Sequence, residues 1–154
     1  MGQIGLTILR VVVGLVFVAH GWRKVMVGFD QVSQSFANLG IPAPLPAAVL
    51  AMLAELVGGA LVLIGLKTRL AAIPPMIVMV VATVVAHLPH GFFLPKGYEY
   101  TLVLLAALVT LILSGPGPAS VDALLKRRKE QERAAGEEKP PDSAADDSTS
   151  GGET

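Results

Sequence analysis

Residues 4–24 read I-G-L-T-I-L-R-V-V-V-G-L-V-F-V-A-H-G-W-R-K, and Arg10 is their only charged residue before the basic residues at the end of the stretch. A helix needs about 20 predominantly apolar residues to cross roughly 30 Å of hydrocarbon. The stretch therefore predicts a membrane-spanning helix. The alternative is a cleaved signal peptide, since residues 11–19 have the length of its apolar region. Residues 1–9 are apolar rather than basic, however, and V-F-V-A-H-G is a poor cleavage site.

Three more apolar runs follow, at about residues 45–66, 70–88 and 98–114, each bounded by charges, prolines or glycines. The whole chain is 53% hydrophobic and only 16% charged, which favours a lipid environment. The last run is short and requires a thinner bilayer or a helix extended over a flanking glycine. We expect an all-α integral membrane four-helix bundle over residues 1–122, with the lipid bilayer as its first partner.

Two segments lie outside these spans. Apolar residues recur every three or four positions at Val25, Phe29, Val32, Phe36 and Leu39, with polar residues between them. This pattern predicts a short amphipathic helix that is stopped near Gly40 and lies on the outer surface. Residues 123–154 form a basic juxtamembrane segment followed, from about residue 130, by a polar acidic tail that we expect to be disordered.

The basic residues predict the orientation of the bundle. With both termini in the cytoplasm, that side holds Lys67 and Arg69 of the second loop and the run K-R-R-K at residues 126–129. The opposite side holds only Arg23, Lys24 and Lys96. The excess of basic residues on the cytoplasmic side of membrane proteins therefore predicts a multi-pass protein of the bacterial plasma (inner) membrane with N-terminus and C-terminus cytoplasmic.

Two charged residues fall deep within the predicted spans. A rise of about 1.5 Å per residue puts Arg10 roughly 21 Å and Glu55 roughly 15 Å below the outer surface. Arg10 shares a helix face with Gly14 and Gly21, where small residues let another backbone approach closely. We predict an Arg10–Glu55 ion pair, either as a functional pair or as a link between two helices.

A second polar group is predicted nearer the outer surface. It consists of His20, Lys24, His87, His90 and Glu99. Histidine and carboxylate side chains can bind a metal, for which His20, His87 and Glu99 are the candidates, or can exchange protons with a quinone. Three interpretations stay open: a metal site, a polar pocket for a small molecule or quinone, and a hydrated bundle mouth without chemistry.

Composition excludes several classes of function. The chain has no cysteine, which excludes disulfide exchange, zinc-thiolate sites and iron–sulfur clusters held by its own thiols. Redox chemistry would need a bound cofactor or a partner protein. Twelve basic and twelve acidic residues balance, and no basic stripe is interleaved with aromatic residues, so nothing indicates nucleic-acid binding.

Several motifs in order resemble the DoxX family of bacterial inner-membrane proteins. They are R-V-V-V-G at residues 10–14, F-V-A-H-G-W-R-K at 17–24, E-L-V-G-G-A-L-V-L-I-G-L-K-T-R at 55–69, the membrane histidine His87, Y-E at 98–99 and G-P-G-P-A-S-V-D at 115–122. The resemblance implies a four-helix membrane protein associated with oxidoreductase systems. The matching site residues are Arg10, His20, Lys24, Glu55, His87 and Glu99.

The leading functional hypothesis is an integral membrane component of a redox or oxidative-stress system, with quinone as the candidate cofactor. Its partners would be cytosolic or membrane redox enzymes. One alternative is a non-enzymatic scaffold that recruits cytosolic partners through residues 126–154, and a less favoured one is a small transporter or channel. The sequence leaves open whether the chain catalyses a reaction and whether it forms a homo-oligomer.

Overall fold

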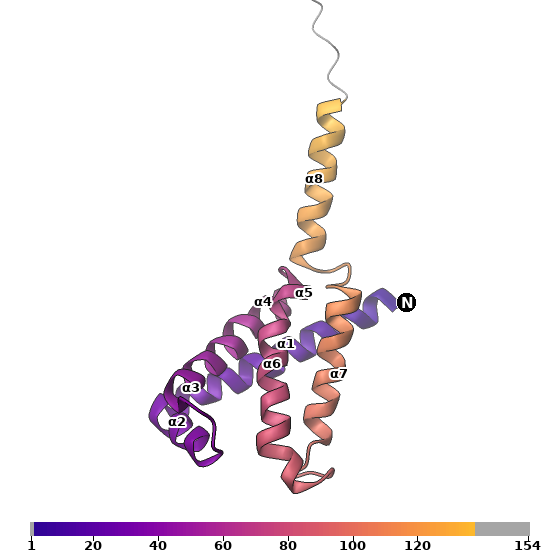
Figure 1. The fold of residues 1–154 in the computed structure, drawn as a ribbon. Helices are drawn as coiled ribbons and strands as arrows, with labels where there is room; N and C mark the ends of the chain where they lie inside the picture. The colour runs from indigo at the N-terminus through magenta and orange to yellow at the C-terminus, as the bar shows by residue number, and fades with distance from the viewer. Residues whose placement is uncertain (1, 138–154) are drawn as a thin grey trace, which may run out of the picture.

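The computed structural model describes residues 2–137, which are helical apart from short connections, with no strand among them (Figure 1). The first half contains α1 (Gly2–Val27), α2 (Phe29–Asn38), α3 (Pro44–Leu53), the π-helical turn η1 (Ala54–Gly58) and α4 (Gly59–Ile64). The second half contains α5 (Thr68–Ala71), α6 (Ile73–Ala82), the π-helical turn η2 (Thr83–His87), the 3₁₀ turn η3 (Leu88–His90), α7 (Glu99–Ser114) and α8 (Val121–Glu137). The predicted all-α fold is confirmed.

Three helical stretches are long and apolar enough to cross a membrane, namely Gly2–Val27, Pro44–Ile64 and Thr68–His90. The fourth apolar helix, α7, has 16 residues and is shorter than the others, as the sequence predicted. α1 packs against the continuous helix formed by α3, η1 and α4, while α6 packs against α7. The two pairs diverge toward the end that carries α2, which we call the α2 end (Figure 1).

The core lies where the two pairs meet. It contains Val13 and Phe17 from α1, Val62 from α4 and, from α7, Leu108 and Leu111, all of which are almost fully buried. Most other apolar side chains are exposed along the outside of the bundle, among them Ile8, Leu50, Leu70, Val103 and Leu113. An apolar exterior is what a helix bundle presents to lipid, so burial and exposure agree with a membrane location.

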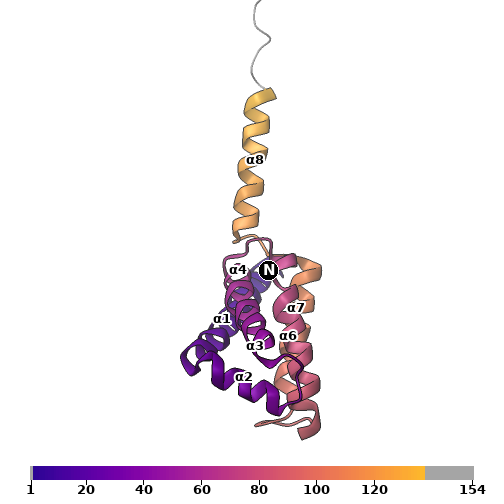
Figure 2. The same ribbon diagram turned by 60° about the vertical axis from the view of Figure 1, so that its left-hand side comes forward.

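The amphipathic helix predicted over residues 25–39 is shorter than expected, because residues 25–27 still belong to α1. α2 begins after Gly28, whose φ of 96° breaks the helix, and is followed by Gly40 with φ of 73°. A positive φ is the region that favours glycine. α2 buries Val32 and lies at the end of the bundle opposite α8 (Figure 2).

α8 corrects the prediction that the chain is disordered from about Glu130. The helix continues to Glu137 and projects away from the bundle (Figures 1 and 2). Lys126 Nζ lies 3.8 Å from Glu130 Oε1, and Arg128 Nε lies 3.4 Å from Glu132 Oε1. The two residues of each pair are one helical turn apart. Such pairs stabilise a helix that has little to pack against. The rest of the predicted tail, residues 138–154, lies outside the described residues.

Candidate functional site

The contact between α1 and the α3–η1–α4 helix is built on glycines. A Cβ added to Gly14 would come within 2.6 Å of the Leu63 backbone, and one added to Gly21 within 2.9 Å of the Leu56 backbone nitrogen. On the other helix, a Cβ at Gly59 would come within 2.8 Å of Phe17 Cβ. These distances are far below van der Waals contact, so only glycine permits this backbone approach. The close approach predicted at Gly14 and Gly21 is confirmed.

Glu55 is 2% exposed and is paired with Lys24, not with Arg10. Lys24 Nζ donates to Glu55 Oε1, whereas Glu55 Oε2 is buried and has no hydrogen-bond partner among the described residues. Glu55 lies in the π-helical turn η1. A π-helical turn leaves some backbone groups displaced from regular α-helical pairing and is frequent at functional sites.

Arg10 is buried as predicted but is bound to backbone carbonyls. Its Nη1 donates to the carbonyl oxygens of Leu63 at 2.8 Å and Val62 at 3.3 Å, and its Nη2 donates to that of Ala119 at 2.5 Å. Two of these carbonyls belong to the last turn of α4, where the helix dipole favours a cation. The predicted Arg10–Glu55 ion pair is therefore wrong, and each residue has a different partner.

The surroundings of Arg10 form a compact joint at the α8 end of the bundle. Gly65 ends α4 with φ of 75°, and a Cβ there would overlap the Arg10 guanidinium. The Asp122 carboxylate accepts hydrogen bonds from the backbone nitrogens of Lys67 at 2.8 Å and Thr68 at 3.2 Å. The backbone nitrogen of Asp122 donates to the carbonyl oxygen of Gly65. Arg10 and Asp122 thus join α1, the α4–α5 turn and the start of α8.

A cavity of about 640 Å³ lies between the two helix pairs, and α2 also contributes to its lining. Its polar lining residues are His20, Lys24, Glu55, His87, Tyr100 and Thr101, and the rest of the lining is apolar. Leu50 of α3 and Ile77 of α6 line it and are 66% and 56% exposed. The cavity therefore opens through the apolar exterior of the bundle. Its volume suits a small ligand.

The two histidines of the cavity lining are held by backbone carbonyls. His20 Nδ1 lies 2.9 Å from the Val16 oxygen, and His87 Nδ1 lies 2.9 Å from the Lys96 oxygen. A carbonyl oxygen only accepts, so Nδ1 of each ring carries the hydrogen and a neutral ring keeps Nε2 as an acceptor. His20 also stacks on Tyr100, with ring centroids 6.4 Å apart, which connects α1 to α7.

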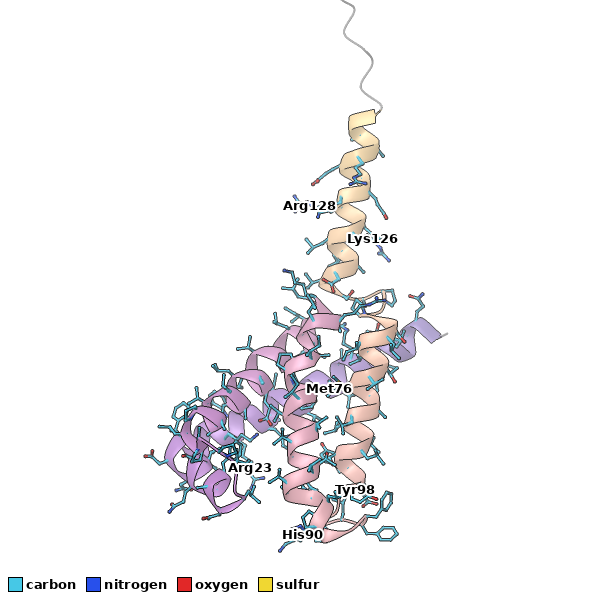
Figure 3. All side chains as sticks on the ribbon, in the orientation of Figure 1. Arg23, Met76, His90, Tyr98, Lys126 and Arg128 are labelled. Atoms are coloured by element: carbon cyan, nitrogen blue, oxygen red, sulfur yellow. The ribbon has the colours of Figure 1, made fainter. Side chains whose placement is uncertain are left out.

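Two members of the predicted outer pocket lie outside the cavity lining. His90 bonds the Ala86 oxygen at 3.0 Å and sits at the tip of the bundle near Tyr98 (Figure 3). Glu99 accepts from the Leu94 nitrogen at 2.9 Å and so fastens the loop before α7. Within residues 2–137, no three histidine or acidic side chains lie close enough to hold a metal. The candidate metal group of His20, His87 and Glu99 does not assemble.

The sequence did not identify Tyr100 and Thr101 as cavity residues. Tyr100 is an aromatic residue near the start of a span, which is typical of the membrane interface, and no local pattern separates it from its neighbour Tyr98. Only the packing of α7 against the other helices directs Tyr100 and Thr101 to the cavity. The site can accommodate a mostly apolar molecule. It can also offer hydrogen-bond donors and acceptors to the polar groups of that molecule.

Fold and site define a helical membrane protein with a cavity open to its apolar exterior. The chain belongs to the DoxX family, whose model matches residues 5–88. It is 38% identical to "Uncharacterized membrane protein Rv3486" of Mycobacterium tuberculosis, over 77% of this chain and 80% of the relative. It is 31% identical to "Putative oxidoreductase CatD" of Bacillus subtilis, over 66% of this chain and 74% of the relative.

A third relative is "Inner membrane protein YphA" of Escherichia coli, which is 30% identical over 76% of this chain and 87% of its own length. No solved structure matches the chain significantly. This chain covers most of the length of each of these relatives. Two of their names describe a membrane protein. The membership in the DoxX family rests on the match over more than half of the chain.

Proposed function

We propose that this chain is an integral component of a redox system in the bacterial inner membrane and that its cavity binds a lipid-soluble molecule of the quinone class. The observation that carries the proposal is the Lys24–Glu55 pair in a cavity that is mostly apolar and open to the exterior. A quinone has the matching chemistry, because a polar ring is joined to an apolar tail that stays in the lipid.

The polar groups of the cavity match both forms of such a molecule. Lys24 has three N–H donors, one of which is used by Glu55, so the others can reach a quinone carbonyl. The unpartnered Glu55 Oε2 and the Nε2 atoms of His20 and His87 can accept hydrogen bonds from quinol hydroxyls. Leaving a buried carboxylate oxygen without a donor is costly, and a quinol hydroxyl would remove that cost.

Electrons must enter and leave through another group. The chain has no cysteine, so the proposed redox role requires a partner protein or a further bound cofactor. The oxidoreductase named among the relatives supports a redox role, and the inner-membrane relative supports the location. The proposed orientation places both termini and α8 in the cytoplasm, because the basic residues gather at the α8 end.

Quenching of the single tryptophan tests quinone binding. Trp22 lies two residues from Lys24 on α1, so a short-chain ubiquinone analogue bound in the cavity should quench its fluorescence in the purified chain. We expect Glu55→Gln to weaken saturable quenching about tenfold, as loss of one charge-assisted hydrogen bond would. The matched control is Glu99→Gln, which makes the same change outside the cavity lining.

Helix content measured by far-UV circular dichroism shows whether each variant is folded. Quenching that is equal in the wild type and Glu55→Gln would remove the quinone site. Equal weakening in both variants would mean that the loss of quenching does not arise at the cavity. Either result would favour the scaffold hypothesis, in which the projecting helix α8 holds partners, over the quinone proposal.

A further inference from the structure

A second hollow lies at the foot of α8, at the opposite end of the bundle from the cavity. Its volume is about 600 Å³, and its lining includes Ile64, Pro118, Ser120, Leu124 and Arg127. Ile64 is the last residue of α4 and therefore marks one end of the second long apolar helix. The end of an apolar spanning helix is where we expect hydrocarbon to meet lipid headgroups, so the hollow lies at that expected depth.

Exposed apolar residues lie beside this hollow, and basic residues follow them on the next turn of α8. Ile64, Leu124 and Leu125 are 47%, 62% and 47% exposed, which is unfavourable in water and favourable against lipid. The next turn of α8 carries K-R-R-K at residues 126–129, and the side chains of Lys126 and Arg128 project from the helix (Figure 3). Lys126 and Arg128 each form an ion pair with a glutamate one helical turn later.

Arg127 differs from Lys126 and Arg128. It lines the hollow, is exposed, and forms no ion pair with any side chain in the described part of the chain. Its planar guanidinium presents several N–H donors in a geometry that matches a phosphate. An apolar wall below a cation of this kind complements a molecule that joins a phosphate to a hydrocarbon chain.

We propose that this hollow binds an anionic phospholipid of the adjoining leaflet, with Arg127 on the phosphate and with Ile64 and Leu124 against the apolar part of the lipid. The surrounding basic residues add attraction to an anionic membrane surface. The inference is independent of the proposed quinone site, since the two sites share no residue. Anionic lipid would also fix the foot of α8 at the headgroup layer.

Native mass spectrometry of the full chain in mild detergent tests the proposal. The wild type is titrated with phosphatidylglycerol or with phosphatidylcholine carrying the same acyl chains. We expect Arg127→Gln to lower retention of phosphatidylglycerol about fivefold, the factor for one basic residue near an anionic surface. The matched control is Arg133→Gln, which removes the same charge from α8 six residues, or about 9 Å, farther from the bundle.

Two further variants separate the contributions of charge and apolar contact. Arg127→Lys keeps the charge but loses the planar donor geometry, so its retention of phosphatidylglycerol should lie between that of the wild type and that of Arg127→Gln. Leu124→Ser should lower retention of phosphatidylglycerol while leaving every charge in place. Helix content is compared for all variants by far-UV circular dichroism.

Selective retention of phosphatidylglycerol that falls in Arg127→Gln and not in Arg133→Gln supports the proposal. Equal retention in the wild type and Arg127→Gln, or equal loss in the two glutamine variants, would overturn it. Inorganic phosphate is added as a competitor at the concentration of the lipid. Full displacement by inorganic phosphate would also overturn it, because the site would then recognise a free anion without the lipid.

Discussion

Removing Lys24 should destabilise the protein far more than removing its partner Glu55. The two residues form one ion pair, but their burial is unequal, with Lys24 25% and Glu55 2% exposed. Lys24→Met leaves a buried carboxylate with neither oxygen partnered, and breaking a buried pair in this way costs about 3–5 kcal/mol. Glu55→Met leaves an ammonium group that is partly exposed in the last turn of α1, so we expect a loss of about 1 kcal/mol.

The double variant Lys24→Met/Glu55→Met sharpens this prediction. Replacing both charges with apolar side chains of similar length is often close to neutral, so we expect it to be within about 1 kcal/mol of the wild type. Adding the second substitution should therefore recover about 2 kcal/mol or more relative to Lys24→Met alone. Such non-additivity is the signature of direct coupling between two residues.

The assay is equilibrium unfolding by SDS in mixed micelles, followed by far-UV circular dichroism. Lys96→Met serves as the control, because it removes an exposed lysine from the loop at the same end of the bundle and should change stability by less than about 0.5 kcal/mol. Similar losses for Lys24→Met and Glu55→Met, or a double variant no more stable than Lys24→Met, would refute the ion pair and its unequal burial.

Two further predictions concern the opposite end of the bundle and the orientation. Arg10→Met removes three hydrogen bonds to backbone carbonyls, one buried and two partly buried, and should cost about 3–5 kcal/mol in the same unfolding assay. Arg23→Met, at an exposed position of α1, should cost little; equal losses would contradict the carbonyl-bound Arg10. A reporter enzyme active only in the periplasm and fused after Glu137 should be silent, because we propose that α8 is cytoplasmic; strong activity would reverse the orientation.

The family motifs have distinct structural roles. Arg10, Gly65 and Asp122 belong to the joint at the α8 end, where a glycine with positive φ, a guanidinium and a carboxylate connect three segments. His20, Lys24 and Glu55 belong to the cavity. A motif that is continuous in sequence, residues 55–69, therefore contributes to both ends of the molecule, because the helix that carries it runs the length of the bundle.

The sequence by itself determined the apolar helices, because membrane spans depend on local length and hydrophobicity. It also identified the buried face of α1, since Arg10, Gly14 and Gly21 recur at helical spacing and are all buried. It did not predict the helical part of α8 beyond Glu130, where pairs of opposite charge one turn apart outweigh the general polarity of the segment.

Only the tertiary structure decided which charged residues meet. Aligning the predicted ends of the spans brought Arg10 and Glu55 to similar depths. The glycine contacts instead place Gly14 beside Leu63 and Gly21 beside Leu56, so Glu55 is level with Gly21. Arg10 is eleven residues away along α1, or about 16 Å, which exceeds the reach of its side chain. The alignment of two helices depends on which backbones can approach most closely, and no local pattern in either helix records that choice.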